Sequence, residues 1–320
     1  MAKHSIWHFF AAAGLSSQLL AGTAPTFAAE VSVEPGKPSR VGPPNFTLPF
    51  FLLNTHIMID GTVNGKKGRF LFDTGTEFAF FLNNETLPLA KDQLVAKGHT
   101  GSGQAMAIYR QKLPIAELTM GRQLRFTELQ GPLHTGWGFL QEAYGMNSFL
   151  GSVGHAFSRN YQFTIDYDQQ TIAFQALDQP GSLSLGTFTA DDIVACIEFT
   201  PSGVDGKIPE ADLQIGDQVI TGFFDTGNPG SLELTEASRD QLIQKGLLTL
   251  SASDYAYGSY GPHQNAHLKG LRIGQVALAD LRNLTFRTGQ RNRLGLGYQF
   301  LKHYISVWNA KTRTITLLKR

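Results

Sequence analysis

A repeated segment constrains the fold of this 320-residue chain more than any other feature. The sequence VNGKKGRFLFDTG (Val63–Gly75) aligns without a gap on IGDQVITGFFDTG (Ile215–Gly227). Each copy is an apolar run that ends in Asp-Thr-Gly, which places Asp73 over Asp225. Internal repetition of this kind indicates that one structural unit occurs twice in the chain.

The distal parts of the two copies also match. The segment SVGHAFSRNYQFTIDYDQQTIAF (Ser152–Phe174) aligns with GLGYQFLKHYISVWNAKTRTITL (Gly295–Leu317), which places Gly154 over Gly297. In each segment a hydrophobic-Gly pair is followed by a short helical pattern, a polar turn and a final apolar strand. The two copies therefore share their beginning and their end.

The repeat and its flanks divide the chain into five parts. We assign residues 46–177 to lobe 1, residues 178–192 to a linker and residues 193–320 to lobe 2. Residues 1–28 have the pattern of a signal peptide. Residues 29–45 are rich in Pro and Gly, which predicts an extended tether. The alternative for this segment is a pro-segment that blocks a cleft until it is removed.

The N-terminal segment predicts export. Lys3 precedes a largely apolar stretch, and TFA (Thr26–Ala28) offers small residues at the positions that a signal peptidase recognises. We expect cleavage near Ala28 and a periplasmic or secreted protein without stable membrane insertion after cleavage. A transmembrane anchor is the alternative, although Gly, Ser and Gln residues interrupt the apolar stretch.

Composition favours a β-rich protein with a substantial core. Hydrophobic residues make up 42% of the chain and charged residues 17%, so we expect it to fold rather than remain disordered. Short alternating runs separated by turn formers predict an all-β fold. The clearest helical patterns lie at Glu236–Leu248 and His155–Tyr161. The single cysteine, Cys196, excludes an internal disulfide and is interpreted as a small buried side chain.

Several partner and cofactor classes find no support in the sequence. The formal net charge of +1 and the lack of a basic run argue against a nucleic-acid partner. His263 and His267 have a spacing that could bind a metal on a helix, but GPHQNAH is a poor helix and predicts a surface or flap loop. The short Gly-x-Gly segments do not open a βαβ unit. We expect no metal or other cofactor.

The Asp-Thr-Gly turns have a chemical consequence. A turn with glycine after an apolar strand points the Asp side chain out of the strand end. Two such units related by a pseudo-two-fold axis would place Asp73 beside Asp225. Two carboxylates at close range hold one shared proton, because both cannot ionise easily. Such a pair supports general acid–base catalysis on an amide.

These motifs resemble those of the aspartic proteases, most closely the tandem retropepsin-like domains of bacterial exported proteins. The resemblance rests on hydrophobic-hydrophobic-Asp-Thr-Gly in each copy and on the later hydrophobic-Gly pair, and it covers most of residues 46–318. It implies two pepsin-like β-barrel lobes related by a pseudo-two-fold axis, with a cleft between them. Flap hairpins over this cleft would lie at His99–Tyr109 and Tyr257–Asn265.

The resemblance also implies roles for the residues of both turns. Asp73 and Asp225 would be the catalytic pair that activates a water. Strands that cross behind the turns would carry Gly154 and Gly297. The residues that would support the pair are Thr74, Gly75, Thr76, Thr226, Gly227 and Asn228. Among these, the two Thr residues that follow the aspartates would interlock the lobes through hydroxyl–backbone contacts.

The second turn departs from the family pattern. The family usually has Ser, Thr or Ala after Asp-Thr-Gly; Thr76 fits, whereas lobe 2 has Asn228-Pro229. The Asn228 amide can donate a hydrogen bond, but with a different geometry. The expected function is an exported aspartic-type endopeptidase that acts as a monomer on peptides or proteins. The alternative is a catalytically silent peptide- or protein-binding module on the same fold. Trp137 either lines the cleft or packs inside lobe 1.

Overall fold

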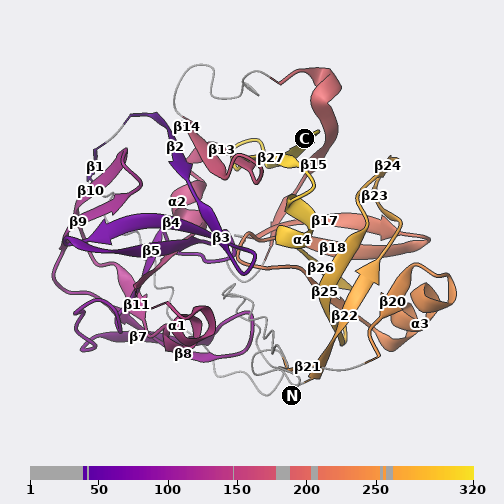
Figure 1. Cartoon of the computed structure of the whole chain (residues 1–320), viewed down its shortest axis with the longest axis horizontal. Helices are drawn as coiled ribbons and strands as arrows, with labels where there is room; N and C mark the ends of the chain where they lie inside the picture. The colour runs from indigo at the N-terminus through magenta and orange to yellow at the C-terminus, as the bar shows by residue number, and fades with distance from the viewer. Residues whose placement is uncertain are drawn as a thin grey trace, which may run out of the picture.

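The protein is described here from a computed structural model (Figure 1). The residues that the structure describes are 39–41, 43–146, 148–177, 188–202, 208–252, 255–256 and 262–320. The predicted signal peptide and tether residues 29–38 therefore lie outside the described residues. The same holds for residues 178–187 of the predicted linker and for residues 257–261 of the second predicted flap.

The chain is predominantly β, as the sequence predicts. Strands of the N-terminal half are β1 (Ser39–Val41), β2 (Asn45–Pro49), β3 (Phe51–Leu53), β4 (His56–Val63), β5 (Lys66–Phe72), β6 (Phe80–Asn83), β7 (Leu94–His99), β8 (Ala105–Arg110), β9 (Ile115–Met120), β10 (Leu124–Leu129), β11 (Leu133–Thr135), β12 (Phe149–Val153), β13 (Tyr161–Asp166) and β14 (Thr171–Ala176).

The C-terminal half also consists mainly of strands. Its strands are β15 (Ile193–Glu198), β16 (Thr200–Ser202), β17 (Ile208–Ile215), β18 (Gln218–Phe224), β19 (Ser231–Leu234), β20 (Leu248–Leu250), β21 (Tyr255–Ala256), β22 (Pro262–Leu268), β23 (Leu271–Ile273), β24 (Val276–Ala277), β25 (Leu281–Thr288), β26 (Arg293–Leu296), β27 (Ile305–Asn309) and β28 (Thr314–Leu318).

Helices are short. They are α1 (Gly138–Tyr144), α2 (His155–Ser158), α3 (Glu236–Gln244), α4 (Tyr298–Leu301) and a 3₁₀ turn at Ala190–Asp192. Both predicted helices are present but shorter than predicted. The Thr235 hydroxyl caps α3 by accepting a hydrogen bond from the Ser238 amide at 3.3 Å. The helix ends before Gly246, which adopts a positive φ of 68°.

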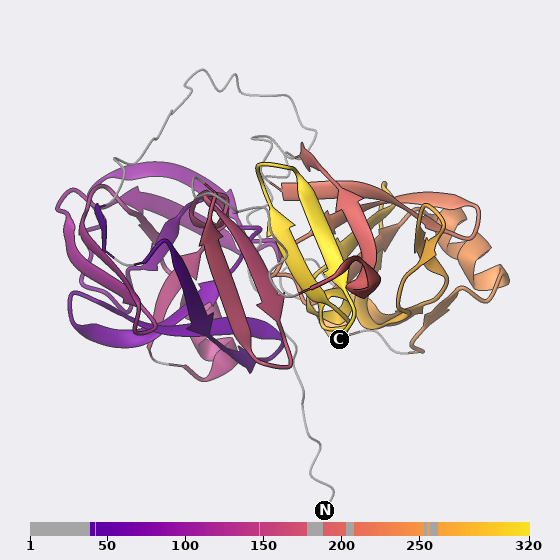
Figure 2. The same cartoon turned by 90° about the horizontal axis from the view of Figure 1, so that it is seen from above.

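The internal sequence repeat is matched by a repeated strand order. One sheet of the N-terminal half contains the order β4-β5-β12-β6-β11-β8, and one sheet of the C-terminal half contains β17-β18-β26-β19-β25-β22. In both sheets the strand that ends in Asp-Thr-Gly pairs in parallel with a later strand, β5 with β12 and β18 with β26. The two halves lie side by side in Figures 1 and 2.

A third sheet joins the halves. Its order is β15-β28-β27-β13-β14-β2, and the central pair is β13 from the N-terminal half and β27 from the C-terminal half. Phe163 on β13 stacks on Trp308 on β27 with ring centroids 5.4 Å apart. One hydrophobic core runs through both halves beneath this sheet. The halves are therefore held together by a continuous ladder and a shared core.

Two expectations for individual segments are wrong. Cys196 is exposed rather than buried, because side chains alternate along β15 and Ala195 and Ile197 are the ones that face the core. Ser39–Val41, within the predicted tether of residues 29–45, pairs with β10 and belongs to the first sheet. Among the described residues no helix has the length and apolarity to span a membrane.

Candidate active site

Each Asp-Thr-Gly turn is fixed by the strand that runs parallel to it. The Asp73 amide donates to the Val153 carbonyl at 2.9 Å, and the Asp225 amide donates to the Leu296 carbonyl at 3.4 Å. Each turn is closed in the same way, because the amide three residues later donates back to the Asp carbonyl at 3.1 Å in both halves. The sequence repeat therefore produces two equivalent turns.

The strands behind the turns approach too closely for any residue but glycine. A Cβ atom at Gly154 would lie 2.2 Å from the Thr76 carbonyl oxygen, and one at Gly297 would lie 1.5 Å from the Asn228 carbonyl oxygen. Gly154 directly follows β12 and Gly297 directly follows β26, so both glycines lie just after the strands that were expected to carry them. Their missing side chains let β12 and β26 pass directly behind the turns.

The two carboxyl groups meet at the junction of the halves. The Gly75 amide donates to Asp73 Oδ1 at 2.9 Å and to Asp225 Oδ1 at 3.1 Å, so a single N–H contacts both side chains. A Cβ atom at Gly75 would lie 2.5 Å from Asp225 Oδ2, and one at Gly227 would lie 2.3 Å from Asp73 Oδ1. The glycine of each turn thus makes room for the carboxyl group of the other turn.

The two threonines after the aspartates interlock the turns. The Thr74 amide donates to Thr226 Oγ1 at 3.0 Å, and the Thr226 amide donates to Thr74 Oγ1 at 3.0 Å. The Thr226 hydroxyl also donates to the Phe72 carbonyl at 2.9 Å. These buried contacts are reciprocal across the junction, and they fix the distance between the two carboxyl groups.

Asp73 receives more hydrogen bonds within its own half than Asp225 does. The Thr76 hydroxyl donates to Asp73 Oδ2 at 2.8 Å, and the Thr76 amide donates to Asp73 Oδ1 at 3.2 Å. The Ser152 hydroxyl donates in turn to Thr76 Oγ1 at 3.4 Å. Asp225 accepts from the amide of Gly227 at 2.8 Å and from the other half.

The prediction that the Asn228 side chain supports the carboxyl pair is wrong. Its Nδ2 donates to Ser231 Oγ at 3.1 Å, and its Oδ1 accepts from the Gly230 amide at 2.8 Å. Because Asn228 bonds to the backbone two residues ahead, its side chain forms a local Asx turn and points away from Asp225. Only the backbone of Asn228 closes the turn, in the same way as that of Thr76.

Burial sets the charge state of the carboxyl pair. Asp73 is fully buried and Asp225 is 3% exposed. Burial raises the pKa of both side chains, and the negative charge of Asp225 together with a carboxyl–carboxyl hydrogen bond raises the pKa of Asp73 further. One proton shared between the two groups is the expected state, because a buried pair of adjacent anions is strongly unfavourable.

One histidine of the site has no recognisable sequence signal. His56 begins β4, is fully buried, and its Nε2 donates to the Gly227 carbonyl of the opposite turn at 3.2 Å. Burial lowers the pKa of His56 to about 4, since it disfavours the charged ring. His56 therefore joins the N-terminal half to the Asp225 turn as a neutral donor at neutral pH. A histidine after a turn in NTHIMID could not be assigned this role without the three-dimensional register.

Other residues singled out in the sequence have structural positions. Trp137 is fully buried and packs against Phe81 and Phe149, so it does not line a cleft. Asp166 Oδ1 accepts hydrogen bonds from two amides of the β13–β14 turn, so Asp166 stabilises this turn. Both candidate metal ligands, His263 and His267, lie on strand β22, and the prediction of a loop is wrong there.

The first predicted flap is a hairpin of β7 and β8, with His99 opposite Ala105. The last four residues of the second predicted flap begin β22, and the rest lies outside the described residues. No group of three or more His, Cys, Asp or Glu residues in the described part of the chain could hold a metal ion.

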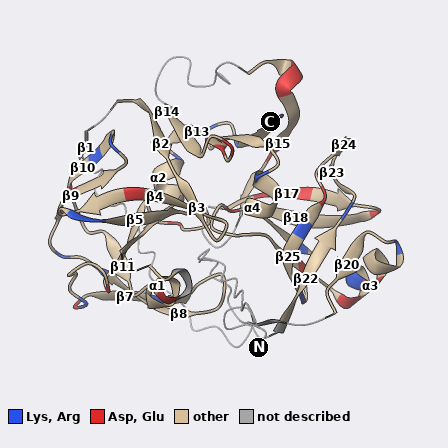
Figure 3. Cartoon of the chain, in the orientation of Figure 1, with Lys and Arg blue, Asp and Glu red and all other residues tan. Residues whose placement is uncertain are grey.

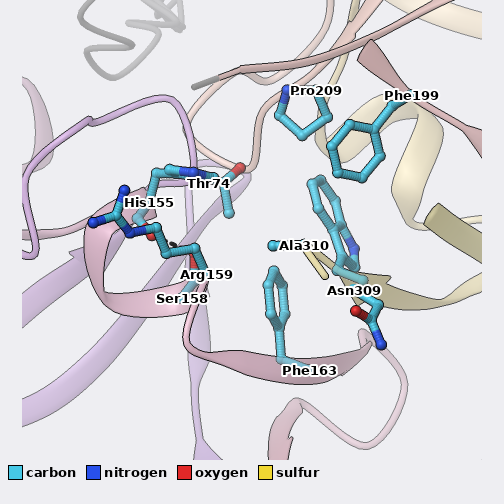
Figure 4. A pocket seen from close by; sticks show the side chains of 10 residues that line it. Thr74, His155, Ser158, Arg159, Phe163, Phe199, Pro209, Asn309 and Ala310 are labelled. Atoms are coloured by element: carbon cyan, nitrogen blue, oxygen red, sulfur yellow. Dashed lines mark hydrogen bonds between the residues drawn. The ribbon is translucent and has the colours of Figure 1, made fainter. Parts of the chain in front are cut away.

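A small cavity beside Thr74 lies between the halves (Figure 4). Rings of Phe163, Phe199 and Trp308 line it, and its lining includes neither Asp73 nor Asp225. Figure 4 draws the Arg159 guanidinium pointing away from these rings. The cavity is therefore mainly apolar and separate from the carboxyl pair.

A search of protein-family models and a search of curated proteins each found no match to this chain.

Proposed function

We propose that the chain is a two-lobed aspartic peptidase of the retropepsin-like type, exported from the cell. The observation that carries this proposal is the carboxyl pair, in which two equivalent turns bring Asp73 and Asp225 to the same amide of Gly75. The reciprocal bonds of Thr74 and Thr226 support it, because they hold the pair in one geometry. On this proposal the N-terminal half is lobe 1 and the C-terminal half is lobe 2.

The chemistry follows from the shared proton. The ionised carboxylate takes a proton from a water, and the water oxygen forms a new C–O bond with the peptide carbonyl carbon. The protonated carboxyl group donates its proton to the carbonyl oxygen. As the tetrahedral species collapses, the carboxylate that is now ionised takes a proton from one of its hydroxyl groups, the C–N bond breaks, and the other carboxyl group delivers its proton to the leaving amine, which restores the pair with one proton. Neither a metal ion nor a covalent intermediate is needed.

The substrate would bind as an extended strand between the lobes. Because both carboxyl groups are buried, a segment must move aside to admit it, and the β7–β8 hairpin is the candidate for this motion. Hairpin residues Thr100 and Ser102 are also buried, which indicates that the hairpin is packed down.

The second candidate function is a catalytically silent peptide-binding module. Two observations favour it: the near-complete burial of both carboxyl groups, and the orientation of the Asn228 amide away from Asp225. In this case Asp73 and Asp225 would only organise the turns. The intact pair of aspartates favours the peptidase, since a silent module has no use for two adjacent buried carboxyl groups that cost stability.

Peptide-library cleavage across pH ~3–7 distinguishes the two functions. The chain lacking residues 1–28 is compared with its Asp73→Asn and Asp225→Asn variants, and products are identified by mass spectrometry. A peptidase with a shared proton cleaves on the acidic side, and each variant loses the activity. Equal cleavage by all three proteins would assign the activity to another site or to a contaminant. No cleavage by any of them at any pH would remove the support for the peptidase.

A further inference from the structure

Two hairpins of lobe 1 contain the same turn with different residues. The β3–β4 hairpin turns at Asn54-Thr55 and the β4–β5 hairpin turns at Asn64-Gly65, each through a two-residue loop. The φ values are 48° and 78° at Asn54 and Thr55, and 48° and 79° at Asn64 and Gly65. A two-residue turn with both φ values positive strongly favours Asn-Gly, which is the pair in the second hairpin. The first hairpin therefore has a threonine where this turn favours glycine.

Threonine is an unfavourable residue for this position. At a positive φ the Cβ atom of an L-residue approaches its own backbone too closely, and a β-branched residue there is a conformational outlier. The other described non-glycine residues with a positive φ are Asn, Gln, Glu and Arg, so Thr55 is the only β-branched one among the described residues. Strained residues of this kind cluster at active sites and at positions that hold ligands.

The hydroxyl group of Thr55 adds a second cost. Its Oγ1 atom is buried, and it has no hydrogen-bond partner among the described residues. A buried hydroxyl without a partner destabilises the folded state, because folding removes its hydrogen bonds to water. The hairpin offers no charged partner from residues 50–59, which contain no Lys, Arg, Asp or Glu (Figure 3). Their only polar side chains are those of Asn54, Thr55 and His56, so the polar groups of the hairpin are concentrated at its tip.

The tip of the β3–β4 hairpin lies beside the carboxyl pair. His56, the residue after Thr55, donates to the Gly227 carbonyl at 3.2 Å, and a Cβ atom at Gly227 would lie 2.3 Å from Asp73 Oδ1. Figure 1 draws this hairpin, in indigo, at the boundary between the two halves. The strained residue with the unpartnered hydroxyl is therefore held next to the turn that carries Asp225.

We infer that Thr55 is a substrate-contacting residue, whose hydroxyl hydrogen-bonds to the main chain of a peptide bound at Asp73 and Asp225. This inference rests on the proposed function, since it assumes that a peptide lies across the carboxyl pair. The main chain of an extended peptide presents N–H and C=O groups, and a threonine hydroxyl can accept from the first or donate to the second. Both carboxyl groups are buried as well, so the motion that admits a peptide to them is also required here.

Three substitutions at Thr55 separate the hydroxyl from the strain, with kcat/KM measured for two cleaved peptides of different sequence. Thr55→Val keeps the branched shape and loses the hydroxyl, so kcat/KM should fall about three- to tenfold for both peptides, the range of one hydrogen bond. Thr55→Ser keeps the hydroxyl and should recover most of this loss. Thr55→Gly should lose as much as Thr55→Val, while its unfolding midpoint in urea rises because glycine tolerates the positive φ.

Gly65→Thr is the matched control, because it places the same residue in the same turn at the opposite end of β4. A Cβ atom at Gly65 would meet nothing within 4 Å, so this substitution strains the backbone without a new contact. Its unfolding midpoint in urea should fall, while kcat/KM should stay at the wild-type value. A loss of kcat/KM equal to that of Thr55→Val would assign the effect to strain in general and overturn the inference.

Two further results at Thr55 would overturn the inference and keep the peptidase. The first is a kcat/KM of Thr55→Val equal to that of the wild type, which is also the result expected if an ordered water is the partner of the hydroxyl. The second is an equal loss in Thr55→Ser and Thr55→Val. An unfolding midpoint of Thr55→Gly at or below that of the wild type would contradict the strain at Thr55 and overturn the inference as well.

Peptide binding separates the inference from the proposed function. The peptide library of the cleavage assay is captured on the Asp73→Asn protein and on the same protein with Thr55→Val, and the retained peptides are quantified by mass spectrometry. Retention that Thr55→Val weakens, without cleavage by the wild type at any pH, would support the contact and overturn the peptidase. No retention and no cleavage, or retention without cleavage that Thr55→Val leaves unchanged, would overturn both.

Discussion

The buried His56 side chain predicts a loss of stability at mildly acidic pH that one substitution should remove. Burial lowers the pKa of His56 from 6.5 to about 4 in the folded protein. Between these two values the unfolded chain binds a proton at His56 and the folded chain does not. The free energy of unfolding therefore falls as the pH is lowered through this window, and the stabilising contribution is complete only above pH ~6.5.

The size of the effect follows from the shift. Each pKa unit corresponds to about 1.4 kcal/mol, so His56 alone lowers the free energy of unfolding by about 3 kcal/mol between pH 8 and pH 4. This is a large fraction of the 5–15 kcal/mol that is typical of a folded protein. The suitable variant is His56→Gln, because an amide can still donate to the Gly227 carbonyl and does not titrate in this range.

Urea denaturation of both proteins at pH 8, 6, 5 and 4 provides the measurement. Groups that titrate equally in the two proteins cancel when their free energies of unfolding are subtracted. As the pH falls from 8 to 4, the stability of the variant relative to the wild type should increase by about 3 kcal/mol. A difference that stays constant over this range would refute the assignment of His56 as a buried neutral donor.

Three further substitutions test the carboxyl pair and its support. Thr226→Val leaves the Thr74 amide and the Phe72 carbonyl without their partner. It should lower the free energy of unfolding, measured by urea denaturation, by roughly 2–4 kcal/mol. An unchanged value would show that the contacts between Thr74 and Thr226 do not stabilise the protein. Gly75→Ala places a Cβ atom 2.5 Å from Asp225 Oδ2 and should reduce kcat/KM about 100-fold by displacing that carboxyl group; full activity would contradict this. Asp225→Asn should raise the free energy of unfolding relative to the wild type. The pKa of the Asp225 carboxyl group is higher in the folded protein than in the unfolded chain, so the wild type loses stability as the pH rises from the unfolded value through the folded value. The difference in free energy of unfolding between Asp225→Asn and the wild type should therefore grow from pH 4 to pH 7. A difference that shrinks over this range would contradict a raised pKa of Asp225.

The sequence predicts the carboxyl pair because its geometry is local and repeated. An apolar strand, an Asp-Thr-Gly turn and a later Gly specify the same turn twice, and the repeated strand order brings Asp73 and Asp225 together. The interlocking threonines were expected from the resemblance to aspartic proteases, and the structure forms these contacts. Each turn is specified by its own residues, whereas the meeting of the two turns depends on the equivalent strand orders of the two halves.

Other features depend on neighbours that the sequence does not identify. Cys196 lies in an alternating strand, but only the packing of the sheet decides which of its two faces is covered by the core. The Asn228 Nδ2 group donates to the Ser231 hydroxyl three residues ahead, and the sequence does not show that this acceptor is used instead of Asp225 three residues behind. The role of His56 depends on a contact with Gly227, which lies 171 positions away in the sequence.

The pH dependence of kcat/KM for one cleaved peptide reports directly on whether Asp73 and Asp225 share one proton. A carboxyl pair with one shared proton predicts a bell-shaped profile on the acidic side, which falls at low pH when both groups are protonated and at higher pH when the shared proton is lost. Asp73→Asn and Asp225→Asn should each lower kcat/KM by at least ~1,000-fold at every pH. Activity that persists in either variant, or a profile that does not change with pH, would contradict the account.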